Sequence, residues 1–237
     1  MSGAEPHAAA GEQPGPGYMS AAKLANYRSE RGARAYLDDH RKKLHRRWSD
    51  RRERRILTEL LGAAAPVGRL LDVPCGFGRL LDLLRDHAAE VVEADVSESM
   101  LALNAELHGD DAAEYLRCSA LDIPVPDRAF DTTVSVRLNH HLDTEADRLR
   151  HLDELCRVTR GRVVLTFFSS SSWKDRLRRL RRRFDGKRPK NTLAPAQVVQ
   201  RFAQNGFRVD ALRPLSRLAS GHVYVRAVRS EVAPDRR

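Results

Sequence analysis

The residues from Arg69 to Leu81 combine an acid with two glycines. The segment reads RLLDVPCGFGRLL, with Asp72 inside an apolar run and Gly76 and Gly78 after it. Glycine lets the backbone turn tightly and approach a ligand closely. A dinucleotide-binding fingerprint needs a third glycine where this chain has Leu81. An acid here would repel a pyrophosphate and suits a ligand that carries positive charge or hydrogen-bond donors.

Two further acids and a pair of histidines follow later β-rich segments of the sequence. Asp95 is followed by Ser97, a candidate N-cap for the next helix, and Asp122 lies in a proline-containing loop where Asp also serves turns. His140 and His141 follow the run 131–137. An imidazole titrates near neutrality and can act as a general base toward a hydroxyl. Each histidine can equally line a ligand pocket or satisfy a local hydrogen bond.

The three cysteines do not suggest a metal or disulfide site. Cys75, Cys118 and Cys156 lie far apart in the sequence, which fits neither a disulfide framework nor a metal-ligand pattern. Cys75 has no histidine or basic residue beside it in sequence to lower its pKa. We therefore interpret it as a small packed residue.

Short β-rich runs alternate with helical stretches through the middle of the chain. Strands alternating with helices predict right-handed crossovers and a mostly parallel sheet covered on both faces, whose strand ends position the residues above. The expected strands are 69–75, 90–95, 114–118, 131–137, 162–168, 207–213 and 222–228, and the expected helices are 80–87, 98–108, 145–159 and 196–204.

Charge is concentrated outside this region. The 237 residues hold 42 Lys and Arg against 32 Asp and Glu, a net charge of +10, and the segments 23–55 and 173–190 each carry +8. These segments are interpreted either as solvated basic faces or as a surface for an anionic partner. No run approaches the roughly 18 apolar residues of a membrane span, and no secretory signal is recognisable. The sequence therefore predicts a cytoplasmic protein.

Taken in order, the motifs resemble those of class I S-adenosylmethionine-dependent methyltransferases, of the ubiquinone-biosynthesis-like (type 11) small-molecule branch. Asp72, Gly76 and Gly78 are similar to the first motif, with Pro74 where the family has its first glycine. VVEADVSESML resembles the second motif, in which an acid, here Asp95, takes the ribose hydroxyls. SALDIPVPDRAFD, VSVRLNHHL and ELCRVTRGRVVL are similar to the later ones, Asp122 corresponding to an acid placed by the adenine.

The resemblance implies a fold, a cofactor and a site. The fold is a Rossmann-like α/β domain with a mostly parallel seven-stranded sheet and an antiparallel last strand. The cofactor is S-adenosyl-L-methionine, with no metal. His140 and His141 are the candidate catalytic residues. The expected cofactor-binding residues are Asp72, Pro74, Gly76, Gly78, Asp95, Val96, Met100, Asp122, Ile123, Arg137, Tyr27 and Arg31.

The expected function is methylation of a small-molecule or lipid-like acceptor at oxygen or carbon. Methyl transfer from an activated sulfonium mainly needs alignment and exclusion of water, so a base is optional. One alternative is a non-catalytic cofactor-binding fold that recruits an anionic partner, and another is an RNA methyltransferase. The segment RLNHH lacks the Asn/Asp-Pro-Pro-aromatic motif of amino-methylating nucleic-acid enzymes, which disfavours a nucleic-acid acceptor.

The segments outside the central region are expected to form a tail, a lid and an inserted basic helix. Residues 1–19 predict a disordered tail, 20–62 a helical lid, and 63–237 the methyltransferase domain with a basic helix inserted at about 172–190. Tyr27 and Arg31 share a helix face and either close over the methionine end of the cofactor or lie in a frayed segment. The helix 173–184 has one apolar stripe among arginines, suited to closing the site or to binding an anionic membrane at the inner face.

Overall fold

The computed structural model describes residues 25, 29–42, 44–62, 66–171, 191–216 and 220–230, without the side chains of residues 40–42, 44–47 and 110. The predicted tail 1–19, Tyr27 and the helix expected over 173–184 lie outside the described residues. Within them, no helix is long and apolar enough to cross a bilayer.

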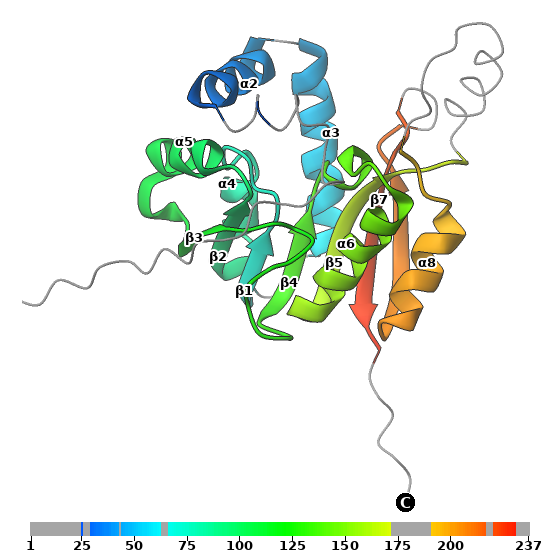
Figure 1. Ribbon diagram of the computed structural model, residues 1–237. Coiled ribbons are helices and arrows are strands. Elements are labelled where there is room, and N and C mark those ends of the chain that lie inside the picture. The colour runs from blue at the N-terminus through cyan, green and yellow to red at the C-terminus, as the bar shows by residue number, and fades with distance from the viewer. Residues whose placement is uncertain are drawn as a thin grey trace, which may run out of the picture.

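Seven strands form one sheet at the centre of the molecule (Figure 1). Their order is β3-β2-β1-β4-β5-β7-β6, with parallel pairing from β3 to β5 and β7 antiparallel to both of its neighbours. The predicted sheet is confirmed in strand number, direction and antiparallel last strand. The strands are β1 Val67–Asp72, β2 Ala88–Asp95, β3 Glu114–Arg117, β4 Phe130–Ser135, β5 Thr159–Phe168, β6 Phe207–Pro214 and β7 His222–Arg229.

Two of these strands end two or more residues earlier than the sequence pattern predicts. β1 ends at Asp72 rather than Cys75 because Pro74 has no N–H to donate to the ladder. β4 ends at Ser135 because the chain turns at Arg137, whose φ is +66°. The carboxyl ends of β1 and β4 lie at the same edge of the sheet, and because both strands are short there, side chains have room at this edge.

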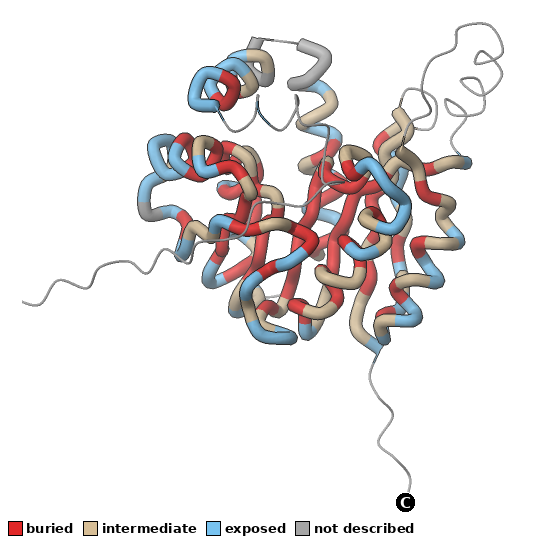
Figure 2. Tube along the Cα trace, viewed as in Figure 1, coloured by how far each residue is buried: buried red, intermediate tan, exposed pale blue. Residues whose placement is uncertain are grey.

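Helices cover both faces of the sheet and bury two apolar clusters. Figures 1 and 2 show helices on both sides of the sheet. Adjacent residues of β1 face opposite sides, so Leu71 belongs to a cluster that includes residues of α6 and α8, whereas Leu70 belongs to one with residues of α3 and α4. These helices are α3 Leu44–Leu61, α4 Leu81–Arg85, α5 Glu98–His108, α6 Glu145–Val158 and α8 Pro195–Gln204, with short 3-10 turns η1 Gly109–Asp111 and η2 Asn139–His141.

The helical structure expected over 20–62 is present as α2 Glu30–Lys42 and as α3. Leu57 and Leu60 of α3 are buried against the sheet. α2 instead packs on α5 through Ala33 and Leu37, and an ion pair of 2.8 Å joins Arg34 to Glu106. α2 therefore lies above the carboxyl ends of β1 and β2, where a lid would lie.

Candidate active site

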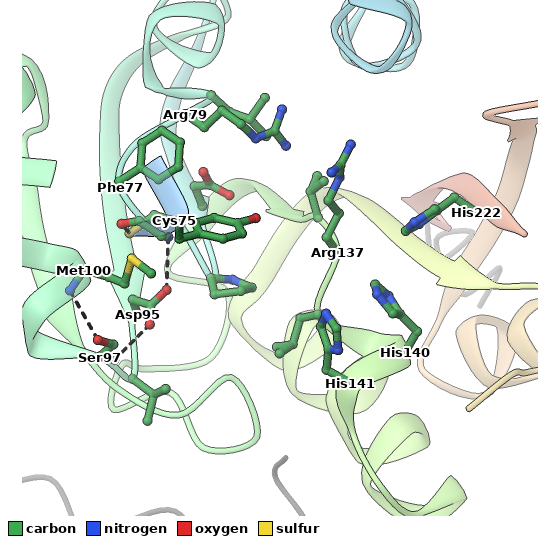
Figure 3. Close-up of a pocket in the computed structure, with 18 of the residues that line it drawn as sticks. Cys75, Phe77, Arg79, Asp95, Ser97, Met100, Arg137, His140, His141 and His222 are labelled. Atoms are coloured by element: carbon green, nitrogen blue, oxygen red, sulfur yellow. Dashed lines mark hydrogen bonds between the residues drawn. The ribbon is translucent and has the colours of Figure 1, made fainter. Parts of the chain in front are cut away.

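A cavity of about 420 Å³ opens at the carboxyl ends of β1, β2 and β4 (Figure 3). Its volume lies within the range of small-molecule sites. Seven of the residues expected to bind the cofactor line this cavity, as do both candidate catalytic histidines. These residues are Asp72, Pro74, Gly76, Asp95, Val96, Met100, Arg137, His140 and His141.

The turn after β1 needs glycine at two positions for different reasons. Gly76 has a φ of +59° and lines the cavity, and no atom lies within 4 Å of where its Cβ would be. Gly78 has a φ of +75°, and a Cβ there would lie 2.1 Å from Oδ1 of Asn104. Gly78 is therefore required by the packing of the turn on α5, and it is not among the residues that line the cavity.

Asp95 ties the end of β2 to this turn. Its carboxylate accepts hydrogen bonds from the N–H of Gly76 at 3.0 Å and of Ser97 at 2.8 Å. Burial raises the pKa of Asp95 to about 6, although these backbone donors act to lower it. The Ser97 hydroxyl accepts from the N–H of Met100 at 3.2 Å, so the predicted N-cap of α5 is confirmed.

Asp72 has a buried oxygen that the described part of the chain leaves unsatisfied. The side chain is 1% exposed, and its Oδ1 has no hydrogen-bond partner among the described residues. Burial, together with the charge of nearby Glu93, raises the pKa of Asp72 well above its ordinary value. An unsatisfied buried carboxyl on a cavity wall is costly unless a ligand donates to it. Asp72 therefore fits a cationic or hydrogen-bond-donating ligand.

Glu93 is a third buried acid, and it was not among the residues expected at the site. It accepts a hydrogen bond of 2.7 Å from Nδ2 of Asn104, and burial raises its pKa to about 7. Beside it, burial and the surrounding acids raise the pKa of Cys75 well above its usual value. Cys75 is thus a packed thiol rather than a nucleophile, as its sequence context indicates. Glu93 lies two residues before Asp95, so both project to one side of β2.

The opposite wall of the cavity is basic and aromatic. The ring of His140 stacks on Phe168 with centroids 4.1 Å apart, and the rings of His141 and His222 lie 4.1 and 5.0 Å from it. All three histidines line the cavity, as Figure 3 shows. His222 begins β7, far along the chain from the other two, and no local motif points to it.

A fully buried acid stands behind this wall. Glu53 of α3 accepts hydrogen bonds from Nε and Nη2 of Arg137 at 3.1 and 2.7 Å and from the Tyr224 hydroxyl at 2.5 Å. Arg79 forms an ion pair with it at 3.0 Å. Both arginines line the cavity. No sequence motif points to Glu53, Arg79 or Tyr224, because these residues come together from three distant segments.

Four expected site residues are described but do not line the cavity. Asp122 is exposed, and Ile123 is buried and donates its N–H to Oε1 of Glu154 at 2.7 Å. Arg31 is exposed on α2, and Gly78 is the fourth. On α2 it is Tyr36 that lines the cavity, with its ring edge-on to Phe77 at 5.8 Å. No group of three or more His, Cys, Asp or Glu in the described part could hold a metal ion.

Comparison with known proteins agrees with this geometry. A family model described as a methyltransferase domain matches residues 71–167, which run from β1 to β5. The demethylmenaquinone methyltransferase of Clavibacter sepedonicus is 38% identical over 113 residues, or 46% of this chain and 45% of the relative. A Xenopus tropicalis protein named tRNA (carboxymethyluridine(34)-5-O)-methyltransferase alkbh8 is 33% identical over 99 residues, or 41% of this chain and 15% of that one.

One solved structure shares nearly the whole fold. It is magnesium protoporphyrin IX methyltransferase from Synechocystis PCC 6803 with bound S-adenosylhomocysteine, at a TM-score of 0.69 and 15% identity, over 88% of this chain and 99% of that one. The chain spans less than half the length of the two relatives above. The matches therefore describe the shared domain and its fold.

Proposed function

Residues 71–167 form a class I S-adenosylmethionine-dependent methyltransferase domain, and from this premise we propose that the protein methylates a small-molecule or lipid-like acceptor at oxygen or carbon. One observation carries the proposal. A single cavity has buried acids, including the unsatisfied Oδ1 of Asp72, on one wall and three histidines on the other. The two walls suit a cationic cofactor and a protic acceptor held side by side.

The acidic wall fits S-adenosylmethionine, which supplies an electrophilic methyl group on a sulfonium when bound. Asp72 offers its free oxygen to the cationic end of the molecule. Asp95 keeps acceptor capacity beyond its two backbone bonds and takes the ribose hydroxyls, since each carboxylate oxygen can accept more than one bond. Val96 and Met100 give apolar contact beside it. Roles for Asp122 and Ile123 near the adenine remain part of the proposal.

The imidazole wall faces the acceptor. His140 or His141 accepts the proton that an acceptor hydroxyl loses when its oxygen gains the methyl group, and the demethylated cofactor leaves. Phe168 fixes the plane of the His140 ring by stacking. An acceptor carbon that is already nucleophilic needs no such base. In both cases the protein contributes mainly position and exclusion of water.

A small-molecule acceptor agrees with two of the similar proteins. The names of those proteins refer to demethylmenaquinone and magnesium protoporphyrin IX, and the cavity is of small-molecule size. An RNA acceptor is the second candidate, because another relative is named as a tRNA methyltransferase and the chain carries a net charge of +10. A non-catalytic cofactor-binding protein is the third.

Turnover separates these candidates. The full chain is incubated with S-adenosylmethionine and either a metabolite extract, a lipid extract or total tRNA, and release of S-adenosylhomocysteine is measured. We expect release with the metabolite or lipid extract only. Release with tRNA alone favours the RNA acceptor, and binding of the cofactor without release from any extract favours the non-catalytic protein.

The lid and membrane roles are part of the same proposal. α2 reaches the cavity through Tyr36, so a chain lacking residues 1–36 should bind S-adenosylhomocysteine more weakly. Full affinity of a folded truncated chain would exclude the lid. The basic helix expected over 173–184 is proposed to hold a cytoplasmic protein at anionic membrane. Salt-sensitive sedimentation with anionic vesicles, absent with neutral vesicles, tests it.

A further inference from the structure

A chain of alternating charges runs from the surface of the protein to the cavity. From surface to cavity its members are Asp82, Arg54, Asp50, Arg79, Glu53 and Arg137. Each forms an ion pair with the next. The distances are 2.9 Å for Asp82–Arg54, 3.1 Å for Arg54–Asp50, 3.0 Å for Arg79–Glu53 and 2.7 Å for Glu53–Arg137, and Asp50 and Arg79 are also in direct contact. Three of the members belong to α3, which lies outside the matched segment 71–167.

The chain becomes buried as it approaches the cavity. The Asp82 side chain is 67% exposed, whereas Glu53 is fully buried. Burial acts to raise the pKa of Glu53, but the charges of Arg79 and Arg137 and the Tyr224 hydrogen bond hold that pKa below its ordinary value. A buried carboxylate is expensive to desolvate unless its partners are well placed. Glu53 is therefore ionised and held rigidly by three side chains.

The cavity end of the chain is not fully balanced. Glu53 is shared between two guanidinium groups, and Arg137 pairs with no other acid among the described residues. Arg137 uses Nε and Nη2 for Glu53, and its Nη1 has no hydrogen-bond partner in the described part of the chain. Its backbone is also held at a φ of +66°, a conformation that a non-glycine residue keeps only when its surroundings impose it. A ligand anion would extend the alternation by one member.

We propose that Glu53 is a positioning residue that orders Arg137 to recognise a carboxylate of the ligand in the cavity, so that α3 completes the binding site. This inference rests on the proposed function, and the carboxylate is that of the cofactor's methionine end. The two-bond contact with Glu53 fixes the plane of the Arg137 guanidinium. Without it a long flexible side chain must be ordered by the ligand alone, at a cost in affinity.

Two nucleoside probes test recognition of the amino-acid end. S-adenosylhomocysteine carries the amino-acid carboxylate and ammonium groups, whereas 5′-methylthioadenosine has the same adenosine and thioether without either. Loss of an anionic Glu53 is expected to matter only through the carboxylate, because Arg137 is a cation. Binding of each to the full chain is measured by calorimetry. For Glu53→Gln, which keeps the size of the side chain and removes its charge, we expect affinity for S-adenosylhomocysteine to fall tenfold or more and affinity for methylthioadenosine to change less than twofold.

A matched variant separates positioning from stability. Leu57→Ala lies one turn further along α3, is buried, and does not line the cavity. It should lower the melting temperature and leave both affinities within twofold. Tyr224→Phe removes only the hydroxyl bound to Glu53 and should weaken S-adenosylhomocysteine by two- to threefold.

Several outcomes would overturn the inference. One is that folded Glu53→Gln binds S-adenosylhomocysteine as well as wild type does. Another is that it binds S-adenosylhomocysteine more tightly, which would mean that Glu53 only screens the charge of Arg137. The third is that both probes are weakened equally. If Glu53→Gln does not fold, Arg137→Gln takes its place, with the same selective loss expected and equal loss contradicting it. A wild-type chain that binds neither probe refutes the proposed function itself, and this inference with it.

Discussion

The two walls of the cavity are built in opposite ways. The acidic wall comes from the ends of β1 and β2, the turns that follow them and the first turn of α5, and it consists of Asp72, Pro74, Gly76, Asp95, Val96, Ser97 and Met100. The basic wall combines Arg79, Arg137 and His140 with His222, and it rests on Glu53 of α3. One wall is therefore local in sequence, and the other is assembled from segments spread along the chain from α3 to β7.

The two walls also differ in how their charges are compensated. Burial raises the pKa of Asp95 to about 6 and that of Glu93 to about 7, because no cation in the described part of the chain lies close enough to offset it. On the other side, Glu53 offsets the burial of Arg137, whose pKa stays above its ordinary value. Asp95 and Glu93 thus have no compensating cation, whereas the cations of the basic wall share one buried acid, Glu53. This difference suits a cationic ligand beside the acids.

The largest expected effect separates the walls by function. His140→Ala and His141→Ala, tested one at a time, should include at least one variant whose turnover falls about 100-fold, the usual contribution of a general base. Its affinity for S-adenosylhomocysteine should stay within twofold, since the acids are untouched. Release of S-adenosylhomocysteine and calorimetry measure the two quantities. Unchanged turnover in both variants would mean that the acceptor needs no imidazole base.

Asp95→Ala, unlike the histidine variants, is expected to lower affinity for the cofactor. Loss of charge-assisted hydrogen bonds to the ribose should cost about 2 kcal/mol, or about 30-fold in affinity for S-adenosylhomocysteine. Glu90→Ala is the control, because Glu90 is an exposed acid on the same strand. Calorimetry should show affinity within twofold of wild type for the control. Equal losses in the two variants would contradict the assignment of the acidic wall.

The pH dependence of binding should come from the acidic wall. Asp95 must be ionised to accept two hydroxyls, and its pKa in the free protein is about 6. As the pH falls below about 6, binding must displace a proton, and affinity should fall by up to tenfold per pH unit. Between pH 7 and 8 this group adds no dependence. Calorimetry from pH 5 to 8 tests this, and Asp95→Asn should bind weakly with a flatter profile.

The smallest effect is expected outside both walls. Asp122 is exposed and does not line the cavity, so a hydrogen bond from it to the adenine competes with water. Asp122→Ala should weaken S-adenosylhomocysteine by about threefold at most, the lower end for a single hydrogen bond. A loss as large as that of Asp95→Ala, measured in the same titration, would place Asp122 in the acidic wall when the cofactor is bound.

The sequence by itself determined the sheet and the local wall. Alternating runs fix which segments become strands, and parallel strands bring their carboxyl ends to one edge. Asp72, Gly76 and Asp95 therefore meet wherever such a sheet forms. The N-cap at Ser97 was also readable, because it depends on close neighbours along the chain.

Only the tertiary structure decided the rest. Glu53 reads in sequence as one acid in a basic helix, and His222 as the first residue of a late strand. Each gains its place through packing: α3 buries Leu57 and Leu60 against the sheet, and β7 inserts beside β5. Side-chain partners that are distant in the sequence leave no spacing signal, because their separation in space is set by how helices and strands pack rather than by any local period.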